Sequence, residues 1–268
     1  MPLIDTHIHS IVSFDGKDHR SDLALTAARL GIQTVCFTDH FDVVEHRGGL
    51  CPPWDWTQTR QEHRQALALK DCPVELLYGI ELGNPQDNPD CTAQALTEPG
   101  LDFVIGSIHF STKKLGREDH YYVKFQDPEH CHFYLDDYFT AMEQMVDRSD
   151  FDAVGHIPYP LRYMRERDGV SVGLLGYEER IRLILRKLAQ SGKAMEVNSC
   201  RSRTIMPEYG WLLRLFKEEG GEFVTVGTDS HCLSHMGLGL TECNALLEAN
   251  GFRYVTLFRG RKPAPIKL

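Results

Sequence analysis

Histidine and carboxylate side chains follow short apolar runs near both ends of this sequence, and such side chains are common ligands of divalent metal ions. His7 and His9 follow the first run, and Asp229 and His231 follow the last one. Residues two positions apart on an extended segment point to the same side, so each pair could hold one ion. One such pair alone is as often two surface side chains. Two pairs, each directly after an apolar run, indicate a metal site.

Four apolar runs between these two end in the same kinds of residue. The residues that follow them are Asp39 with His40, Glu81, His109 and His156. Glu81 is costly to bury unless it is paired or bound to a metal, and its carboxylate could bridge two cations, which imidazole cannot do. Each of the three histidines taken alone is more often an ordinary core or surface residue.

These distant segments can form one site only in a fold that brings the ends of several strands together. Strand-like apolar runs lie at residues 3–4, 34–37, 74–78, 103–105, 153–154, 194–197 and 223–226. Helical patterns end before Gly31, Gly192 and Gly220, while residues 43–56 and 83–100 are expected to be long loops. Seven strand–helix units without a domain break predict a single-domain α/β barrel over residues 1–268, with the site at the C-terminal ends of its strands. An open doubly wound sheet is the alternative, but no GxGxxG or P-loop motif favours it.

The composition limits the classes of partner. With 42% hydrophobic and 25% charged residues, the chain has the balance of a globular protein, which excludes disorder, collagen and a coiled coil. Its net charge of −9 disfavours nucleic acid as a partner. No apolar stretch long enough to span a membrane and no secretory signal are visible, so a cytoplasmic protein with reduced cysteines is expected. The oligomeric state is not indicated.

Six ordered motifs of this sequence resemble those of the PHP (polymerase and histidinol phosphatase) superfamily. The motifs are DTHIHS, FTDHFD, YGIELG, GSIHF, DAVGHIP and GTDSH, and they extend from Asp5 to His231. The tail YVTLFRGRKP is similar to the end of stand-alone histidinol-phosphatases. The segment that begins at Glu196 resembles their EVN-x-x-x-x-R pattern, which ends here at Arg203.

The resemblance implies a distorted (β/α)7 TIM-like barrel that carries two to three divalent ions. One ion would be held by His7, His9, Glu81 and Asp229; a second by Glu81, His109 and His156, with Glu81 bridging; and a third by Asp15, His40 and His231. Manganese, iron, zinc and magnesium are the candidate metals. Some relatives have histidine where this chain has Asp15, and the oxygen ligand favours manganese, magnesium or iron over zinc in the third site.

The resemblance also implies a metal-dependent phosphomonoester hydrolase with a small-molecule substrate, best matched by L-histidinol phosphate. Water activated between two ions would attack the phosphorus atom, and Glu81, Asp229 and His231 would be the catalytic residues, with Asp39 a further candidate for proton transfer. For substrate binding, Arg203 and Arg162 would grip the phosphate, and Asp42 or Glu45 would face the substrate ammonium group. The sequence departs from many relatives at Pro158, where an aspartate that could support His156 is missing.

Three alternatives are weighed against this function. The first is a phosphoesterase of the same superfamily with another substrate, either a nucleotide phosphatase or a 3′–5′ exonuclease. The second is a PHP domain that binds metal without catalysis, although each ligand position is filled. The third is a metal-dependent amidohydrolase barrel, which would normally have eight strand units and a bridging lysine.

Overall fold

A parallel β-sheet forms the centre of the molecule in the computed structural model, which describes residues 1–45 and 48–268. The strands are β1 (Ile4–Ile8), β2 (Thr34–Phe37), β3 (His40–Asp42), β4 (Glu75–Gly83), β5 (Phe103–Ser107), β6 (Ala153–Val154), β7 (Ala194–Asn198) and β8 (Val224–Gly227). The main path through the sheet is β1-β2-β4-β5-β6-β7-β8, and β3 pairs with β4 beyond the end of β2. Within the described ranges, these seven strands of the main path confirm the predicted seven-unit barrel.

The first and last strands of this path lie against each other and nearly close the barrel. The backbone N–H of Asp229 donates to the carbonyl oxygen of His7 at 2.9 Å, and that of His9 donates to the carbonyl oxygen of Ser230 at 2.8 Å. The Thr6 hydroxyl also donates to the carbonyl oxygen of Val226 at 3.0 Å. The two ends of the sequence that carry the predicted ligand pairs are therefore adjacent in space.

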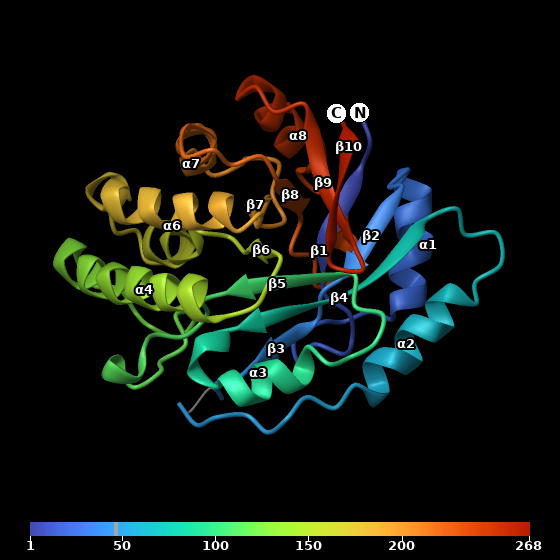
Figure 1. The fold of residues 1–268 in the computed structure, drawn as a ribbon, viewed down its shortest axis with the longest axis horizontal. Helices are drawn as coiled ribbons and strands as arrows, with labels where there is room; N and C mark the ends of the chain where they lie inside the picture. The colour runs from blue at the N-terminus through green and yellow to red at the C-terminus, as the bar shows by residue number, and fades with distance from the viewer. Residues whose placement is uncertain (46–47) are drawn as a thin grey trace.

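Helices cover the outer face of the sheet, with α4, α6 and α7 on one side and α1 and α2 on the other (Figure 1). Their bounds are α1 (Arg20–Leu30), α2 (Thr57–Leu67), α3 (Pro89–Ala95), α4 (Pro128–Arg148), α5 (Tyr159–Leu161), α6 (Glu178–Gln190), α7 (Glu208–Glu218) and α8 (Leu240–Ala249). Helix α1 ends at Gly31 in the left-handed conformation, as its sequence pattern predicts. Helix α6 buries Ile181, Ile184 and Leu188 on one face.

One of the two predictions of a long loop is wrong. Residues 83–100 contain the 3-10 turn Pro85–Asp87 and helix α3, because Asn88 caps the helix by accepting a hydrogen bond from the N–H of Cys91 and Pro89 starts its first turn. In the other predicted loop, 43–56, the described residues contain no helix or named strand, only an isolated bridge between Val44 and Leu50. Residues 46 and 47 of that loop lie outside the described residues.

A C-terminal hairpin, which the strand prediction does not include, lies under the amino-terminal ends of the strands. It consists of β9 (Tyr254–Arg259) paired antiparallel with β10 (Lys262–Lys267). Phe258 stacks on Phe103 of β5 with ring centroids 5.1 Å apart. In the turn, the Arg261 guanidinium donates hydrogen bonds of 2.8 to 3.2 Å to Asp150 and Asp152. The hairpin therefore closes this end of the barrel with apolar packing and ion pairs.

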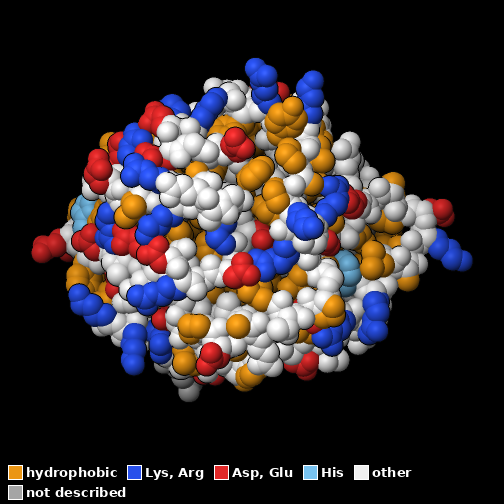
Figure 2. Space-filling model, in the orientation of Figure 1, with side chains coloured by type: hydrophobic (Ala, Val, Ile, Leu, Met, Phe, Trp, Pro, Cys, Tyr) orange, Lys and Arg blue, Asp and Glu red, His pale blue; other side chains and the backbone are white. Residues whose placement is uncertain are grey.

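The surface carries charged side chains of both signs. On the face shown in Figure 2, acidic and basic side chains are intermixed and neither sign dominates. Among the described residues, no helix is both long and apolar enough to cross a membrane. All eight cysteines are free thiols, as expected.

Candidate metal centre

The predicted ligands meet at the carboxyl ends of the strands, at the bottom of a cavity of about 1100 Å³. Six of them line the cavity: Asp15, His40, His109, His156, Asp229 and His231. The other three, His7, His9 and Glu81, are fully buried. All of them lie near the carboxyl end of a barrel strand or shortly after it, except Asp15, which lies on the loop between β1 and α1. The structure thus brings all nine predicted ligands into one region.

Glu81 lies at the centre of this cluster. One carboxylate oxygen, Oε1, accepts a hydrogen bond from the Ser107 hydroxyl at 2.6 Å. Five histidine rings surround its two oxygens: His156 Nε2 at 2.9 Å and His109 Nε2 at 3.2 Å from Oε1, and His40 Nδ1 at 2.8 Å, His7 Nε2 at 3.3 Å and His9 Nε2 at 3.6 Å from Oε2. Burial raises the pKa of this carboxyl group, but the surrounding imidazoles outweigh burial and hold the pKa well below its usual range. Glu81 is therefore a buried carboxylate in a position between several nitrogen ligands.

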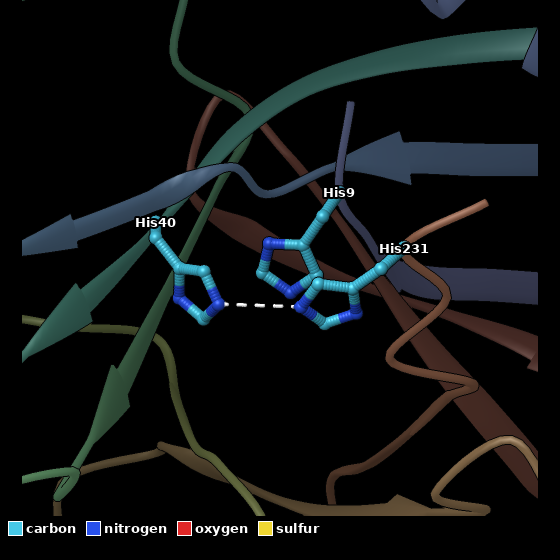
Figure 3. A group of neighbouring side chains, drawn as sticks. All are labelled: His9, His40 and His231. Carbon is cyan, nitrogen blue, oxygen red and sulfur yellow. Dashed lines mark hydrogen bonds between the residues drawn. The ribbon is translucent and has the colours of Figure 1, made fainter. Parts of the chain in front are cut away.

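Side chains in this region form overlapping groups whose ligand atoms lie within 4.8 Å of one another. These groups are His7 with His9 and Asp229, His7 with Glu81 and His156, His9 with His40 and His231, and His40 with Asp42 and His109. Figure 3 shows the third group, in which His40 Nε2 and His231 Nε2 are 3.4 Å apart. Asp15 Oδ2 is 3.0 Å from His231 Nε2. The groups resemble the three predicted ligand sets, but His7, His9 and His40 each belong to two of the groups.

Several candidate ligand atoms at the centre of the cluster lie close to one another but make none of the hydrogen bonds that buried polar atoms normally have. Among the described residues, His7 Nε2, His9 Nε2, His40 Nδ1 and Glu81 Oε2 are buried without a hydrogen bond. Unsatisfied buried polar atoms are rare and costly in a folded protein, and here imidazole nitrogens and a carboxylate oxygen converge. This set of atoms fits divalent metal ions, because such ions bind both nitrogen and carboxylate oxygen.

The outward ring nitrogens of several histidines are held by acceptors. His7 Nδ1 lies 2.7 Å from Glu196 Oε1, and His231 Nδ1 lies 2.8 Å from the carbonyl oxygen of Asp229. Such contacts fix the ring and leave Nε2 free for a metal. Sequence reasoning missed Glu196, although a carboxylate inside an apolar strand was a visible signal of the same kind as Glu81.

The sequence predicts that Asp42 faces the ammonium group of the substrate, whereas in the structure it contacts a histidine. It lines the cavity, but its Oδ1 atom lies 2.6 Å from His109 Nδ1. A side chain at Gly83 would prevent this contact, because a Cβ atom there would lie 1.6 Å from Asp42 Oδ1. The geometry favours Asp42 as the residue that orients His109.

One of the two predicted phosphate-binding arginines lies on the cavity. Arg162, which begins the π-helical segment Arg162–Arg167, lines the cavity as expected. Arg203 is exposed and is not among the lining residues; Arg201 lines the cavity instead, with Nη1 3.3 Å from His231 Nδ1. The reason is a tight turn after β7: Cys200 and Arg201 have φ of 51° and 60°, and the Arg201 N–H donates to the carbonyl oxygen of Thr228. This turn holds residue 201 beside β8, and the chain then leaves the site before residue 203.

Two further residues differ from their sequence interpretation. Asp39 does not face the cavity, because its carboxylate pairs with Arg20 Nη2 at 2.6 Å, so it is not available for proton transfer to a substrate. Pro158 directly precedes the short helix α5, in which the ring centroid of Tyr159 lies 4.8 Å from that of His156. An aromatic ring thus lies beside His156 in this chain.

Comparisons with known proteins agree with this geometry. The family model described as PHP domain matches residues 5–200. The chain is 27% identical to a probable histidinol-phosphatase of Thermotoga maritima, over 99% of this chain and 100% of that protein. It is 28% identical to a histidinol-phosphatase of Lactococcus lactis, over 98% and 96% of the two chains. A solved structure of a histidinol phosphate phosphatase from Lactococcus lactis, in complex with zinc, L-histidinol and phosphate, superposes with a TM-score of 0.79 at 26% identity, covering 98% of each chain.

Proposed function

The chain belongs to the PHP domain family, and on this premise we propose that it hydrolyses L-histidinol phosphate to L-histidinol and phosphate. The observation that carries the proposal is the presence of two arginines, Arg162 and Arg201, on the same cavity as the cluster around Glu81. Relatives that bear the histidinol-phosphatase name match nearly the whole chain. A phosphomonoesterase needs positive charge both from arginine side chains and from metal ions, because the phosphoryl group of the substrate is a dianion near neutral pH.

The same proposal assigns two to three divalent ions to the cluster, as manganese, iron, zinc or magnesium. The residues that would hold them are the three sets expected from the sequence: His7, His9, Glu81 and Asp229; Glu81, His109 and His156; and Asp15, His40 and His231. When bound, such ions supply positive charge to phosphoryl oxygens and lower the pKa of water, which is the chemistry that hydrolysis of a stable phosphate ester requires.

The chain's own side chains would bind and orient the phosphate. Arg162 Nη1 and Arg201 Nη2 lie 4.0 and 3.9 Å from Asp229 Oδ2, so both guanidinium groups point to the edge of the metal cluster. Each is about a quarter exposed or less, and a partly buried guanidinium holds a phosphate more strongly than one in open water. Glu81, Asp229 and His231 remain the proposed catalytic residues.

The alcohol part of the substrate would occupy the wider part of the cavity. Its wall contains aromatic side chains, among them Trp54, Tyr121 and Tyr159, which suit the flat imidazole ring of histidinol. With Asp42 engaged by His109, Glu45 on the same wall is the other candidate for the ammonium group. The remaining parts of the proposal are a single domain over residues 1–268 and a cytoplasmic location.

Phosphate release from a panel of substrates tests the function. The panel contains L-histidinol phosphate, nucleotides and p-nitrophenyl phosphate, each with added manganese, iron, zinc or magnesium. We expect kcat/KM for L-histidinol phosphate to exceed the others by at least about tenfold, since its imidazole ring and ammonium group would contact the aromatic wall and Glu45 of the cavity. Equal rates on all substrates would leave a phosphatase of another specificity. No release with any metal would favour a PHP domain without catalysis.

A further inference from the structure

The ring of His9 has a different partner from the other buried ligand at the end of β1. His7 Nδ1 faces the carboxylate of Glu196, whereas His9 Nδ1 faces the hydroxyl of Ser13, with Oγ 3.2 Å away. Ser13 lies on the loop between β1 and α1 and is 3% exposed. A serine hydroxyl can donate or accept, so its partners determine which it does toward His9.

The first partner of Ser13 is Asp39, which is 1% exposed and holds the loop from below. Its carboxylate accepts hydrogen bonds from the N–H and hydroxyl of Ser10 at 2.6 and 2.8 Å, and from the Ser13 hydroxyl at 2.8 Å. The loop is tightly folded here, since a Cβ atom at Gly16 would lie 1.9 Å from the carbonyl oxygen of Ser10. Asp39 therefore fixes the place of the Ser13 hydroxyl.

Arg20 keeps Asp39 in its ionised form. Its Nη2 atom donates to Asp39 Oδ2 at 2.6 Å, and its guanidinium lies over the Phe37 ring, 5.0 Å from the centroid. The backbone N–H groups of Ser10 and Ser13 donate to Asp39 Oδ1 at 2.6 and 3.3 Å, so both carboxylate oxygens are surrounded by donors. An ionised carboxylate can only accept hydrogen bonds, so Ser13 must donate to it.

The hydrogen bonds of Ser13 also determine whether its hydroxyl donates to His9 or accepts from it. The backbone N–H of His40 donates to Ser13 Oγ at 3.0 Å. With its one hydrogen given to Asp39, the hydroxyl can only accept from His9, which requires a proton on His9 Nδ1. His9 Nε2 is then an unprotonated lone pair, 3.3 Å from Asp229 Oδ1 and without a hydrogen bond.

We propose that Ser13 is a positioning residue that sets the tautomer of His9, with Nδ1 protonated and Nε2 bare, before any metal ion binds. The Arg20–Asp39 pair sets the direction in which Ser13 donates, and the same hydroxyl ties the end of β1 to the first residue of β3, His40. The proposal rests on the proposed function in one respect, that His9 Nε2 binds a metal ion. A neutral serine orients His9 without adding a third carboxylate beside Glu81 and Asp229.

The tautomer of His9 can be observed directly in the wild-type protein. A long-range ¹H–¹⁵N spectrum of chelator-treated protein, with the His9 signals assigned from the His9→Gln variant, should show protonated Nδ1 and unprotonated Nε2. In Ser13→Ala the metal-free protein should show a mixture of the two tautomers. A proton on Nε2 in the metal-free wild type would overturn the proposal, whether or not the variant folds.

Metal affinity gives the second measurement. Zinc alone, in competition with a chelator and counted by mass spectrometry, should bind Ser13→Ala about 10- to 100-fold more weakly than the wild type. Ser13→Thr keeps the hydroxyl and should recover most of the affinity. Ser10→Ala removes a hydrogen bond to the same Asp39 carboxylate without touching His9, and should change zinc affinity by less than about threefold.

The outcomes separate this proposal from the proposed function. If Ser10→Ala weakens zinc binding as much as Ser13→Ala, the effect belongs to the loop as a whole and the role of Ser13 is refuted. If the tautomer and zinc results are as expected but wild-type protein releases no phosphate from any substrate, the proposed function fails and the role of Ser13 stands.

Discussion

At the carboxyl ends of the strands, buried atoms of His7, His9 and Glu81 have no hydrogen bond, whereas at the amino ends Arg261 is fully engaged by Asp150 and Asp152. The two ends of the barrel thus differ in whether their buried polar groups have hydrogen-bond partners. The amino end gains stability from the hairpin β9–β10. The carboxyl end leaves polar atoms unsatisfied, which costs stability unless a ligand binds them. Variants at the two ends should therefore fail in different ways.

The largest effect is expected at the centre of the carboxyl end. Glu81→Ala and His9→Ala should each lower kcat for phosphate release by at least about 10³-fold, because each removes an atom to which a metal ion would bind. His63→Ala is the control, since His63 does not line the cavity and packs on Tyr78 with ring centroids 4.8 Å apart. Substantial turnover in Glu81→Ala would contradict the proposed centre.

The next effect distinguishes the two arginines of the turn after β7. Arg201→Ala should lower kcat/KM by about 10²-fold, because a charged hydrogen-bond donor to the phosphate is lost. The matched variant Arg203→Ala should stay within about twofold of the wild type, since this side chain is exposed and outside the cavity. Steady-state kinetics with L-histidinol phosphate measures both. Equal losses would restore the sequence-based choice of Arg203.

The amino end should respond in stability and not in catalysis. Arg261→Ala should lower the free energy of unfolding by about 2 kcal/mol, because it leaves Asp152, which is 7% exposed, without its charged partner. Urea unfolding measures this, and kcat/KM of the folded variant should change by less than about twofold. Lys262→Ala, at an exposed position of the same hairpin, is the control. Loss of activity without loss of stability would remove the contrast between the two ends.

The smallest effect is expected away from both ends of the barrel, where helix α2 packs on the sheet. Burial, and then the charge of Arg20, lower the pKa of His63 from 6.5 to about 4. The unfolded chain therefore binds this proton more readily, so the stability contributed by neutral His63 is complete above pH 6.5 and is lost as the pH falls toward 4. Between pH 7 and pH 6 its share of the decrease in unfolding free energy is about 0.7 kcal/mol. His63→Gln should remove this share from urea unfolding measured at both pH values, and an unchanged pH dependence would contradict it.

Much of the barrel could be predicted because its strands are buried on both faces and read as continuous apolar runs. The predicted strands at 34–37 and 153–154 coincide with β2 and β6. The predicted end of β4 at residue 78 was too early, because the strand continues through the charged Glu81 to Gly83. A charged residue inside a strand interrupts the apolar pattern from which strands are recognised.

The site was predictable to the level of residue type and strand end, but not to the level of turns and hydrogen bonds. The sequence predicts Arg203 as a phosphate ligand, whereas the structure places Arg201 on the cavity, because the left-handed conformations at residues 200 and 201 leave no clear sign in a single sequence. The contact between Asp42 and His109 joins residues 67 positions apart, and only the register of the sheet brings them together. Patterns along the chain cannot show such contacts.

The meeting of β1 and β8 has a consequence for how the molecule is made. The backbone N–H of Asp229 pairs with the carbonyl oxygen of His7 across more than 200 residues of chain. Contacts between such distant segments form late in folding, because the intervening loop must close first. The set of proposed ligands is thus complete only when the last barrel strand has docked, so binding of added metal by the refolding chain would report the end of folding.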